Sequence, residues 1–236
     1  FMKPLRLATL VSHPIQYFSP LYREVAARPQ VDLTVYYCSR MGLDANYDPG
    51  FGRVLRWDVP LLEGYRSRFL HNVSALIKWG SFWSLINPSI VSELIRERYD
   101  ALWVHGYYGL TNWLAIITAY IIGTPILLRG ESNLQGSHQS RSHLGKWLLL
   151  RGLMRIISAG MYIGTKNREF YQYLGIHDDC LFFTPYSVDN NYFQKQARGL
   201  ESRRNEFRQS FGVLDERPLI LFAGKLIPQK QPLLLL

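Results

Sequence analysis

Two lysines near the carboxyl end of the chain have a spacing that suits an anion. Lys225 follows Gly224 directly after the apolar run 218–223, and Lys230 comes five residues later, just before an apolar segment. A strand, a glycine turn with lysines and a following helix would present ammonium groups and N-terminal N–H groups to a phosphate. This segment therefore predicts a phosphate-binding turn, and two solvated lysines beside a turn are the alternative.

Polar side chains also follow three other apolar runs, 5–11, 101–105 and 125–129. Runs of this length are typical of buried strands, and ligands on parallel sheets bind beyond the carboxyl ends of the strands. The candidate ligand-binding side chains are His13, Gln16, Tyr17, His105 and Glu131. They are expected to gather at one edge of a sheet.

Each candidate has a chemical role and a structural alternative. A histidine at a strand end beside glycine, such as His105, can reach a ligand by hydrogen bond, or it can be a satisfied structural histidine. Aromatic and amide groups at His13, Gln16 and Tyr17 suit sugar stacking and hydrogen bonding, although His13 could instead cap the next helix. Glu131 can accept hydrogen bonds from a ligand, or it can form an ion pair with Arg129.

The spacing of apolar runs and amphipathic segments predicts an α/β fold, a doubly wound, Rossmann-like parallel sheet. Strands are expected over 5–11, 31–38, 101–105, 125–129, 161–164, 181–184 and 219–223. Helices are expected over 20–27, 86–98, 110–122, 142–157, 165–174 and 203–211, with a loop or small hairpin within 40–64. Cap signals are Asn87 before Pro88, Thr165, and Gly175 as a stop.

Composition places the chain among globular proteins, with 236 residues, 47% hydrophobic and 19% charged. The net charge of +9 fits nucleic acid, an anionic membrane or a phosphorylated substrate. Finger spacings and RNA-binding aromatic motifs are missing from the sequence, so no nucleic acid partner is expected. Cys38 and Cys180 are expected to be buried free thiols, and without a signal peptide the expected location is cytoplasmic.

Four segments together resemble family 4 glycosyltransferases. They are a strand that ends in histidine (99–106), a strand–helix junction (163–170), a Pro-Tyr-Ser-Val-Asp segment (185–193) and the lysine turn (219–230). Departures from the family pattern are Lys225 where Arg is more common, His13-Pro14 where two glycines are frequent, and Glu131 where His-Asp is frequent. No Gly-x-Gly-x-x-Gly follows the first strand, which argues against a nicotinamide dehydrogenase.

The resemblance implies one half of a two-domain GT-B architecture. Residues 1–198 would be an amino-terminal acceptor-binding domain, 199–217 a linker, and 218–236 the first strand and turn of a donor-binding domain. The implied activity is retaining transfer of a sugar from a nucleotide-sugar to a glycan or lipid-linked acceptor, in cell-surface polysaccharide synthesis, with no obligatory metal or other cofactor. His105 would be the active-site histidine, and Gly224, Lys225 and Lys230 would bind the donor phosphates. The acceptor would contact His13, Gln16 and Tyr17, and Glu131 would contact the sugar or the acceptor.

Alternatives remain open at this point. A non-catalytic carbohydrate- or lipid-binding module would keep the aromatic loop without a donor site, and another GT-B enzyme such as a nucleotide-sugar epimerase also fits. The carboxylate pair that the family uses would lie beyond Leu236, so the chain alone is expected to be inactive. Segments 69–85 and 142–157 combine aromatic and basic residues, which favours peripheral binding to an anionic membrane surface, or else packing on the sheet.

Overall fold

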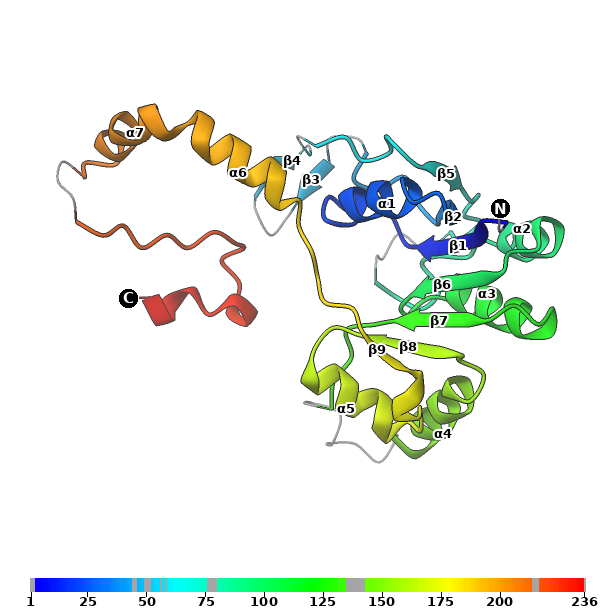
Figure 1. Cartoon of the computed structure of the whole chain (residues 1–236). Coiled ribbons are helices and arrows are strands. Elements are labelled where there is room, and N and C mark those ends of the chain that lie inside the picture. The colour runs from blue at the N-terminus through cyan, green and yellow to red at the C-terminus, as the bar shows by residue number, and fades with distance from the viewer. Residues whose placement is uncertain are drawn as a thin grey trace.

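The computed structural model describes residues 3–43, 46–48, 52–55, 57, 59–75, 80–134, 143–213 and 217–235. At its centre is a sheet of seven parallel strands in the order β5-β2-β1-β6-β7-β8-β9 (Figure 1). The strands are β1 (Leu5–Val11), β2 (Val31–Tyr37), β5 (Arg66–Phe69), β6 (Ala101–His105), β7 (Ile126–Arg129), β8 (Ala159–Tyr162) and β9 (Leu181–Phe183). The chain winds outward from β1 to one edge and then from β6 to the other, which confirms the doubly wound α/β prediction.

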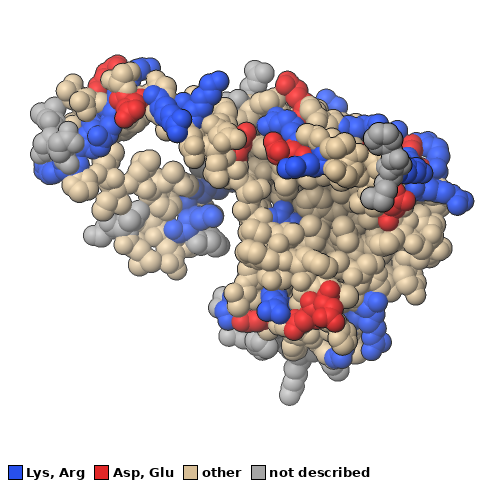
Figure 2. All heavy atoms as spheres, in the orientation of Figure 1, with Lys and Arg blue, Asp and Glu red and all other residues tan. Residues whose placement is uncertain are grey.

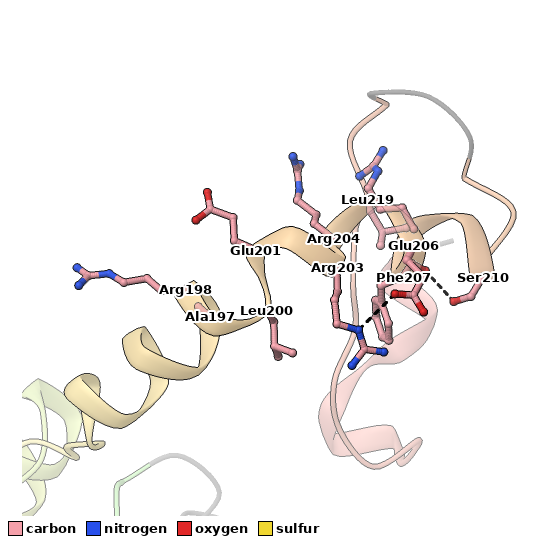
Figure 3. Close-up of a pocket in the computed structure, with 11 residues that line it drawn as sticks. Ala197, Arg198, Leu200, Glu201, Arg203, Arg204, Glu206, Phe207, Ser210 and Leu219 are labelled. Atoms are coloured by element: carbon pink, nitrogen blue, oxygen red, sulfur yellow. Dashed lines mark hydrogen bonds and ion pairs between the residues drawn. The ribbon is translucent and has the colours of Figure 1, made fainter.

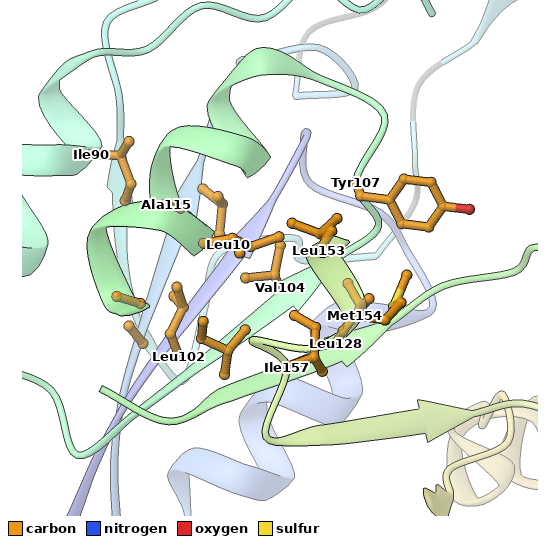
Figure 4. Packing of buried hydrophobic residues seen from close by; sticks show 14 of the residues in the cluster. Leu10, Ile90, Leu102, Val104, Tyr107, Ala115, Leu128, Leu153, Met154 and Ile157 are labelled. Atoms are coloured by element: carbon orange, nitrogen blue, oxygen red, sulfur yellow. The ribbon is translucent and has the colours of Figure 1, made fainter. Parts of the chain in front are cut away.

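Helices cover both faces of this sheet. One face carries α2 (Ser89–Glu97), α3 (Leu110–Ile121), α4 (His143–Met154) and α5 (Thr165–Tyr173), and the other carries α1 (Phe18–Ala26). Strand residues alternate between the two layers, so that Leu10 packs with α2–α5 and Val11 packs with α1. Figure 4 shows Leu10, Leu102 and Val104 packed against residues of the covering helices. Each such side chain contributes roughly 1.5–3 kcal/mol through burial.

Three predicted cap roles differ in the structure. Asn87 is fully buried, and its side-chain amide donates to the carbonyl oxygens of Cys38 (3.0 Å) and Leu70 (3.2 Å), so it ties loops together and does not cap α2. Pro88 is the residue before the first helical position, and Gly164, not Thr165, precedes α5. Gly175 follows α5 with φ of +96°, as a helix stop signal predicts.

Two elements were not predicted, and one predicted strand does not form. The structure adds β5 at the sheet edge and α6 (Asn190–Gly199), and it forms the hairpin β3 (Asn46–Asp48) and β4 (Arg53–Leu55) within the expected loop. Residues 219–223 form no strand, and Ile220 and Leu221 are both 79% exposed. The strand prediction was wrong because a strand needs a neighbour for its backbone N–H and C=O groups, and the described part of the chain supplies none there.

The carboxyl-terminal part leaves the sheet after β9. Figure 1 shows the chain running from β9 to α6, then through α7 (Arg204–Ser210) to a carboxyl-terminal segment that lies apart from the sheet. The predicted helix after Lys230 is only a short 3-10 turn, Pro232–Leu235, in the described residues. The division at 198 and 217 stays a prediction.

Both cysteines are free, as predicted, with Cys38 buried and Cys180 partly buried. Burial raises the pKa of Cys38 to about 12, so this thiol stays protonated. In Figure 2, Lys and Arg side chains are dispersed among Asp and Glu, and neutral residues fill the middle of the visible face. Within the described ranges, every helix is too short or too polar to cross a membrane.

Candidate functional site

A pocket of about 200 Å³ lies at the carboxyl ends of β1, β6 and β7. The chain turns from one half of the sheet to the other between β1 and β6, and this switch point is where doubly wound sheets bind ligands. The lining residues are Val11, Ser12, Ile15, Tyr17, Phe18, His105, Gly106, Tyr108, Arg129, Gly130, Glu131 and Tyr186. Three of the five candidate side chains, Tyr17, His105 and Glu131, line this pocket.

His105 is the last residue of β6 and is held by aromatic neighbours. Its Nε2 lies 3.1 Å from the hydroxyl of Tyr22, which is buried on α1. The ring of Phe18 meets it edge-on with centroids 4.5 Å apart, and Trp103 lies at 4.7 Å. Burial, and then the positive charge of Arg129, lower the His105 pKa from 6.5 to about 3. At neutral pH the ring is therefore uncharged and suited to hydrogen bonding.

Arg129 pairs with His105 in the register of β6 and β7 and brings a cation into the pocket wall. Its side chain is buried at 4% exposure, with its guanidinium carbon 5.0 Å from the Phe18 ring centre and 4.6 Å from that of Tyr186. Its Nη2 donates to the Thr184 carbonyl at 3.3 Å, whereas Nε and Nη1 have no hydrogen-bond partner in the described structure. Burial lowers the pKa of this group.

Glu131 lies at the exposed rim of the pocket. The Tyr186 hydroxyl donates to its carboxylate, and the Tyr186 ring also meets Tyr17 edge-on at 5.3 Å. No ion pair joins Glu131 to Arg129 among the described residues, so the structural alternative given for Glu131 is not seen. Burial and the Glu131 charge raise the pKa of Tyr17. The rim therefore offers a carboxylate and two phenols to a ligand.

The predicted first loop is only partly in the pocket. Tyr17 lines it, but Gln16 is exposed and neither Gln16 nor His13 belongs to its lining. His13 Nδ1 lies 2.8 Å from the Ser12 hydroxyl, and burial lowers the His13 pKa to about 4. The capping alternative is also not seen, because α1 begins at Phe18 and no side chain caps it. Direct ligand contact by His13 and Gln16 is thus not supported by this pocket geometry.

Sequence reasoning missed several pocket residues. Tyr22 and Arg129 surround His105 or line the pocket, and neither was proposed as a ligand-binding residue, whereas Phe18 and Tyr186 do follow predicted strands, as ligand-binding positions are expected to. A signal was present for Arg129, because a charged residue at the end of an apolar strand needs a partner. Tyr186 comes from the segment after β9, and only the three-dimensional fold brings it to the end of β1.

Gly224, Lys225 and Lys230 do not meet this pocket. They lie in the carboxyl-terminal segment, outside the pocket lining, and the predicted strand and helix around them do not form. Nearer to that segment, an open hollow of about 930 Å³ lies along α6, α7 and Leu219 (Figure 3). Phe207 in this hollow is 65% exposed, and Arg203 pairs with Glu206 at 3.3 Å. The role of the lysines in donor binding stays a prediction.

The described residues contain no group of three or more His, Cys, Asp or Glu side chains arranged to hold a metal ion. The polar groups of the pocket are a neutral imidazole, a guanidinium, a carboxylate and phenols. Such a set can hold sugar hydroxyls by hydrogen bond, place aromatic rings against a sugar face, and bind an anionic group.

No protein-family model matches this chain, and no curated protein matches it. Solved structures do match. Anabaena Alr3699/HepE in complex with UDP and glucose has a TM-score of 0.55 at 14% identity, over 89% of this chain and 51% of that one. A UDP-N-acetylglucosamine 2-epimerase matches with a TM-score of 0.52 at 15% identity, over 77% of this chain and 48% of that one. The Neisseria meningitidis UDP-GlcNAc 2-epimerase bound to UDP-GlcNAc matches with a TM-score of 0.51 at 13% identity, over 90% of this chain and 54% of that one.

These similarities define the fold class. The chain has a Rossmann-like α/β fold, and the solved structures that it matches have the GT-B fold. It spans about half the length of the solved structures that it matches.

Proposed function

We propose that this chain is the sugar-binding half of a GT-B enzyme that acts on a nucleotide-sugar. The observation that carries this proposal is the pocket at the sheet's switch point, which His105, Tyr17 and Glu131 line together. Its volume of about 200 Å³ is below that of sites for drug-sized ligands, roughly 300–1,000 Å³, so it suits one sugar unit and not a whole nucleotide-sugar.

The reaction that we propose is glycosyl transfer to a glycan or lipid-linked acceptor in cell-surface polysaccharide synthesis. The segment resemblance to family 4 glycosyltransferases supports it, and transfer would proceed with retention. His105, neutral at pH 7, would donate or accept a hydrogen bond near the sugar centre as positive charge develops there. Lys225 and Lys230 would offset the charge that develops on the departing nucleotide diphosphate.

A nucleotide-sugar epimerase is the second candidate. Two of the three solved structures described above are UDP-GlcNAc 2-epimerases, and the same half-fold would serve either reaction. The two activities differ in a measurable way. An epimerase that inverts a carbon by removing its proton and returning one from solvent to the other face places deuterium on that carbon in heavy water, whereas a transferase does not.

The test uses the protein with whatever sequence continues past Leu236. It is incubated in heavy water with UDP-glucose or UDP-GlcNAc, with and without a glycan acceptor, and products are followed by NMR. A glycosylated acceptor without deuterium in the sugar supports transfer, and a deuterated epimer supports epimerisation. Sugar binding without turnover of any nucleotide-sugar would instead establish the non-catalytic binding module.

Peripheral membrane contact is part of the transferase proposal. Trp83 is 54% exposed and Leu148 and Leu149 on α4 are 55% and 57% exposed, beside basic residues of the same segments. Lys78 and Trp79 of the first segment lie outside the described residues. Co-sedimentation with anionic vesicles that Leu148→Ser plus Leu149→Ser weakens would support it. Equal sedimentation of wild type and this variant with anionic vesicles would contradict it.

A further inference from the structure

Arg129 is a buried cation whose hydrogen-bonding capacity is mostly unused. Its guanidinium has five N–H donors, yet the only hydrogen bond that the structure describes is the 3.3 Å contact from Nη2 to the Thr184 carbonyl. Nε and Nη1 are both buried without a partner. A buried charge is normally paired or hydrogen-bonded, so an unpaired guanidinium in a pocket wall needs an explanation.

Among the described residues no carboxylate lies within ion-pair distance of Arg129, although the nearby Glu131 charge acts to raise the pKa of its guanidinium. Its guanidinium lies between the rings of Phe18 and Tyr186, which interact with the cation through their faces. The neighbouring histidine, His105, is neutral, and its low pKa reflects burial and the charge of Arg129. Glu131 is the acidic group in the pocket lining, and its carboxylate binds the Tyr186 hydroxyl at the exposed rim.

We propose that Arg129 binds an oxyanion of the sugar that enters this pocket, so that the site takes a sugar with a carboxylate or a phosphate. This inference rests on the proposed sugar-binding function and names the substrate class for it. Carboxylate and phosphate share the chemistry that a guanidinium recognises, which is a charge-assisted hydrogen bond to oxygen.

Tyr186 controls access to the guanidinium. Of the two rings beside Arg129, Phe18 is buried at 6% exposure, whereas Tyr186 is 42% exposed. Tyr186 also belongs to the segment between β9 and α6 and is held by the rim carboxylate of Glu131. An entering oxyanion therefore replaces the Tyr186 ring beside Arg129, while Phe18 stays in place.

The first experiment compares a neutral sugar with two sugars that carry an oxyanion. The full chain is titrated with glucose, glucuronate, glucose 1-phosphate and inorganic phosphate, and binding is followed by NMR or calorimetry. Wild type should bind glucuronate or the sugar phosphate at least tenfold more tightly than glucose. The Arg129→Gln variant should lose this difference, and Arg129→Lys should keep part of it. The matched control is Arg151→Gln, which removes a charge on α4 outside the pocket lining and should retain the preference.

The four ligands identify which oxyanion binds, and their pattern shows whether this inference or the proposed function fails. Preference for glucuronate indicates an acidic sugar, and preference for glucose 1-phosphate indicates a phosphorylated one. If glucose binds as tightly as both charged sugars, the anion site is refuted while sugar binding stands. If none of the sugars binds, both the proposed function and this inference fail. If inorganic phosphate alone binds, the pocket is an anion site without a sugar site, and the inference is overturned.

Stability gives a second readout. Arg129→Met keeps an unbranched side chain but removes the unpaired buried charge, so the variant without ligand should unfold at a higher temperature than wild type. A residue kept only for structure would behave in the opposite way. A lower unfolding temperature together with an unchanged preference for charged sugars would show that Arg129 serves the fold and would refute its role in binding.

Discussion

The Tyr22 hydroxyl lies 3.1 Å from Nε2 of His105 and joins helix α1 to the end of strand β6. Tyr22 is 1% exposed, and burial raises its pKa, so the hydroxyl stays protonated at every ordinary pH. Because this contact occupies one ring nitrogen from inside the protein, it fixes the orientation in which His105 meets the pocket.

Removing this hydroxyl should destabilise the fold. Tyr22→Phe leaves the buried Nε2 of His105 without its partner, which should lower the free energy of unfolding by about 1–3 kcal/mol. Urea denaturation followed by circular dichroism measures the change. Tyr120→Phe is the matched control, because Tyr120 is 59% exposed and should lose almost nothing. Equal stability of the two variants would mean that the Tyr22–His105 contact contributes little.

Stability should fall as the pH falls below neutral. The folded-state pKa of His105 is about 3 and that of His13 about 4, both below the ordinary value of 6.5. Between these values the unfolded chain binds more protons than the folded one, so acid favours unfolding. Each histidine should contribute a slope of up to about 1.4 kcal/mol per pH unit as the pH drops from about 6.5.

The variant His105→Gln isolates this effect. It should reduce the pH dependence of the free energy of unfolding between pH 6.5 and 4, and leave the part that His13 contributes. Denaturant titrations at several pH values measure the slope. The same slope in wild type and His105→Gln would contradict a buried, neutral His105.

Gly106 should tolerate alanine poorly. Its φ is +77°, and an added Cβ would lie 3.1 Å from Cδ2 of Tyr108, at the pocket wall. Gly106→Ala should therefore cost about 1 kcal/mol or more of stability and shift Tyr108 away from Ser132, whose hydroxyl it contacts at 2.9 Å.

Gly123 provides the matched control for this strain. Its φ is +75°, yet an added Cβ would meet nothing within 4 Å, so Gly123→Ala carries the backbone cost alone. Thermal unfolding of Gly106→Ala and Gly123→Ala separates the backbone cost from the cost of the contact with Tyr108. Equal losses of unfolding temperature in the two variants would show that Tyr108 moves aside at no cost.

The lysine turn should matter only where a second domain is present. In a form of the protein that continues past Leu236 and binds UDP, Lys225→Ala and Lys230→Ala should each weaken UDP binding by about tenfold to 100-fold, since a charged hydrogen bond contributes roughly 1.5–3 kcal/mol. The control Lys195→Ala removes an exposed lysine from α6. Thermal stabilisation by UDP measures the effect, and equal stabilisation of all three variants would exclude the turn from donor binding.

Much of the fold could be predicted because buried parallel strands are short apolar runs. Strands β1 and β6 have the predicted bounds. Strand β5 was missed because its sequence is Arg66-Ser-Arg-Phe69, with arginines that pair with carboxylates, Arg66 with Asp32 at 3.2 Å and Arg68 with Glu93 at 2.7 Å. Such an edge strand has no apolar pattern to detect.

The sequence predicted the edge of the sheet where the pocket lies better than it predicted which residues line that pocket. His105, Tyr17 and Glu131 meet as expected because the carboxyl ends of parallel strands share an edge. The contacts of Tyr186 and Phe18 with Arg129 could not be predicted in this way, since they depend on a crossing of segments far apart in the sequence. The role of Arg129 was hidden for a related reason. The adjacent Glu131 suggested a local ion pair, but the fold directs that carboxylate toward Tyr186.

The short segment between β9 and α6 touches the pocket twice, through the Thr184 carbonyl on Arg129 and through the Tyr186 ring. It also forms the root of α6, where the Asp189 side chain accepts from the Tyr192 backbone N–H at 2.9 Å. A ligand that displaces Tyr186 would therefore also move the residues that lead into α6. If the displacement of Tyr186 also shifts α6, the coupling is reciprocal: a partner that binds only the shifted α6 changes the pocket affinity by the same factor as the pocket ligand changes the affinity of that partner.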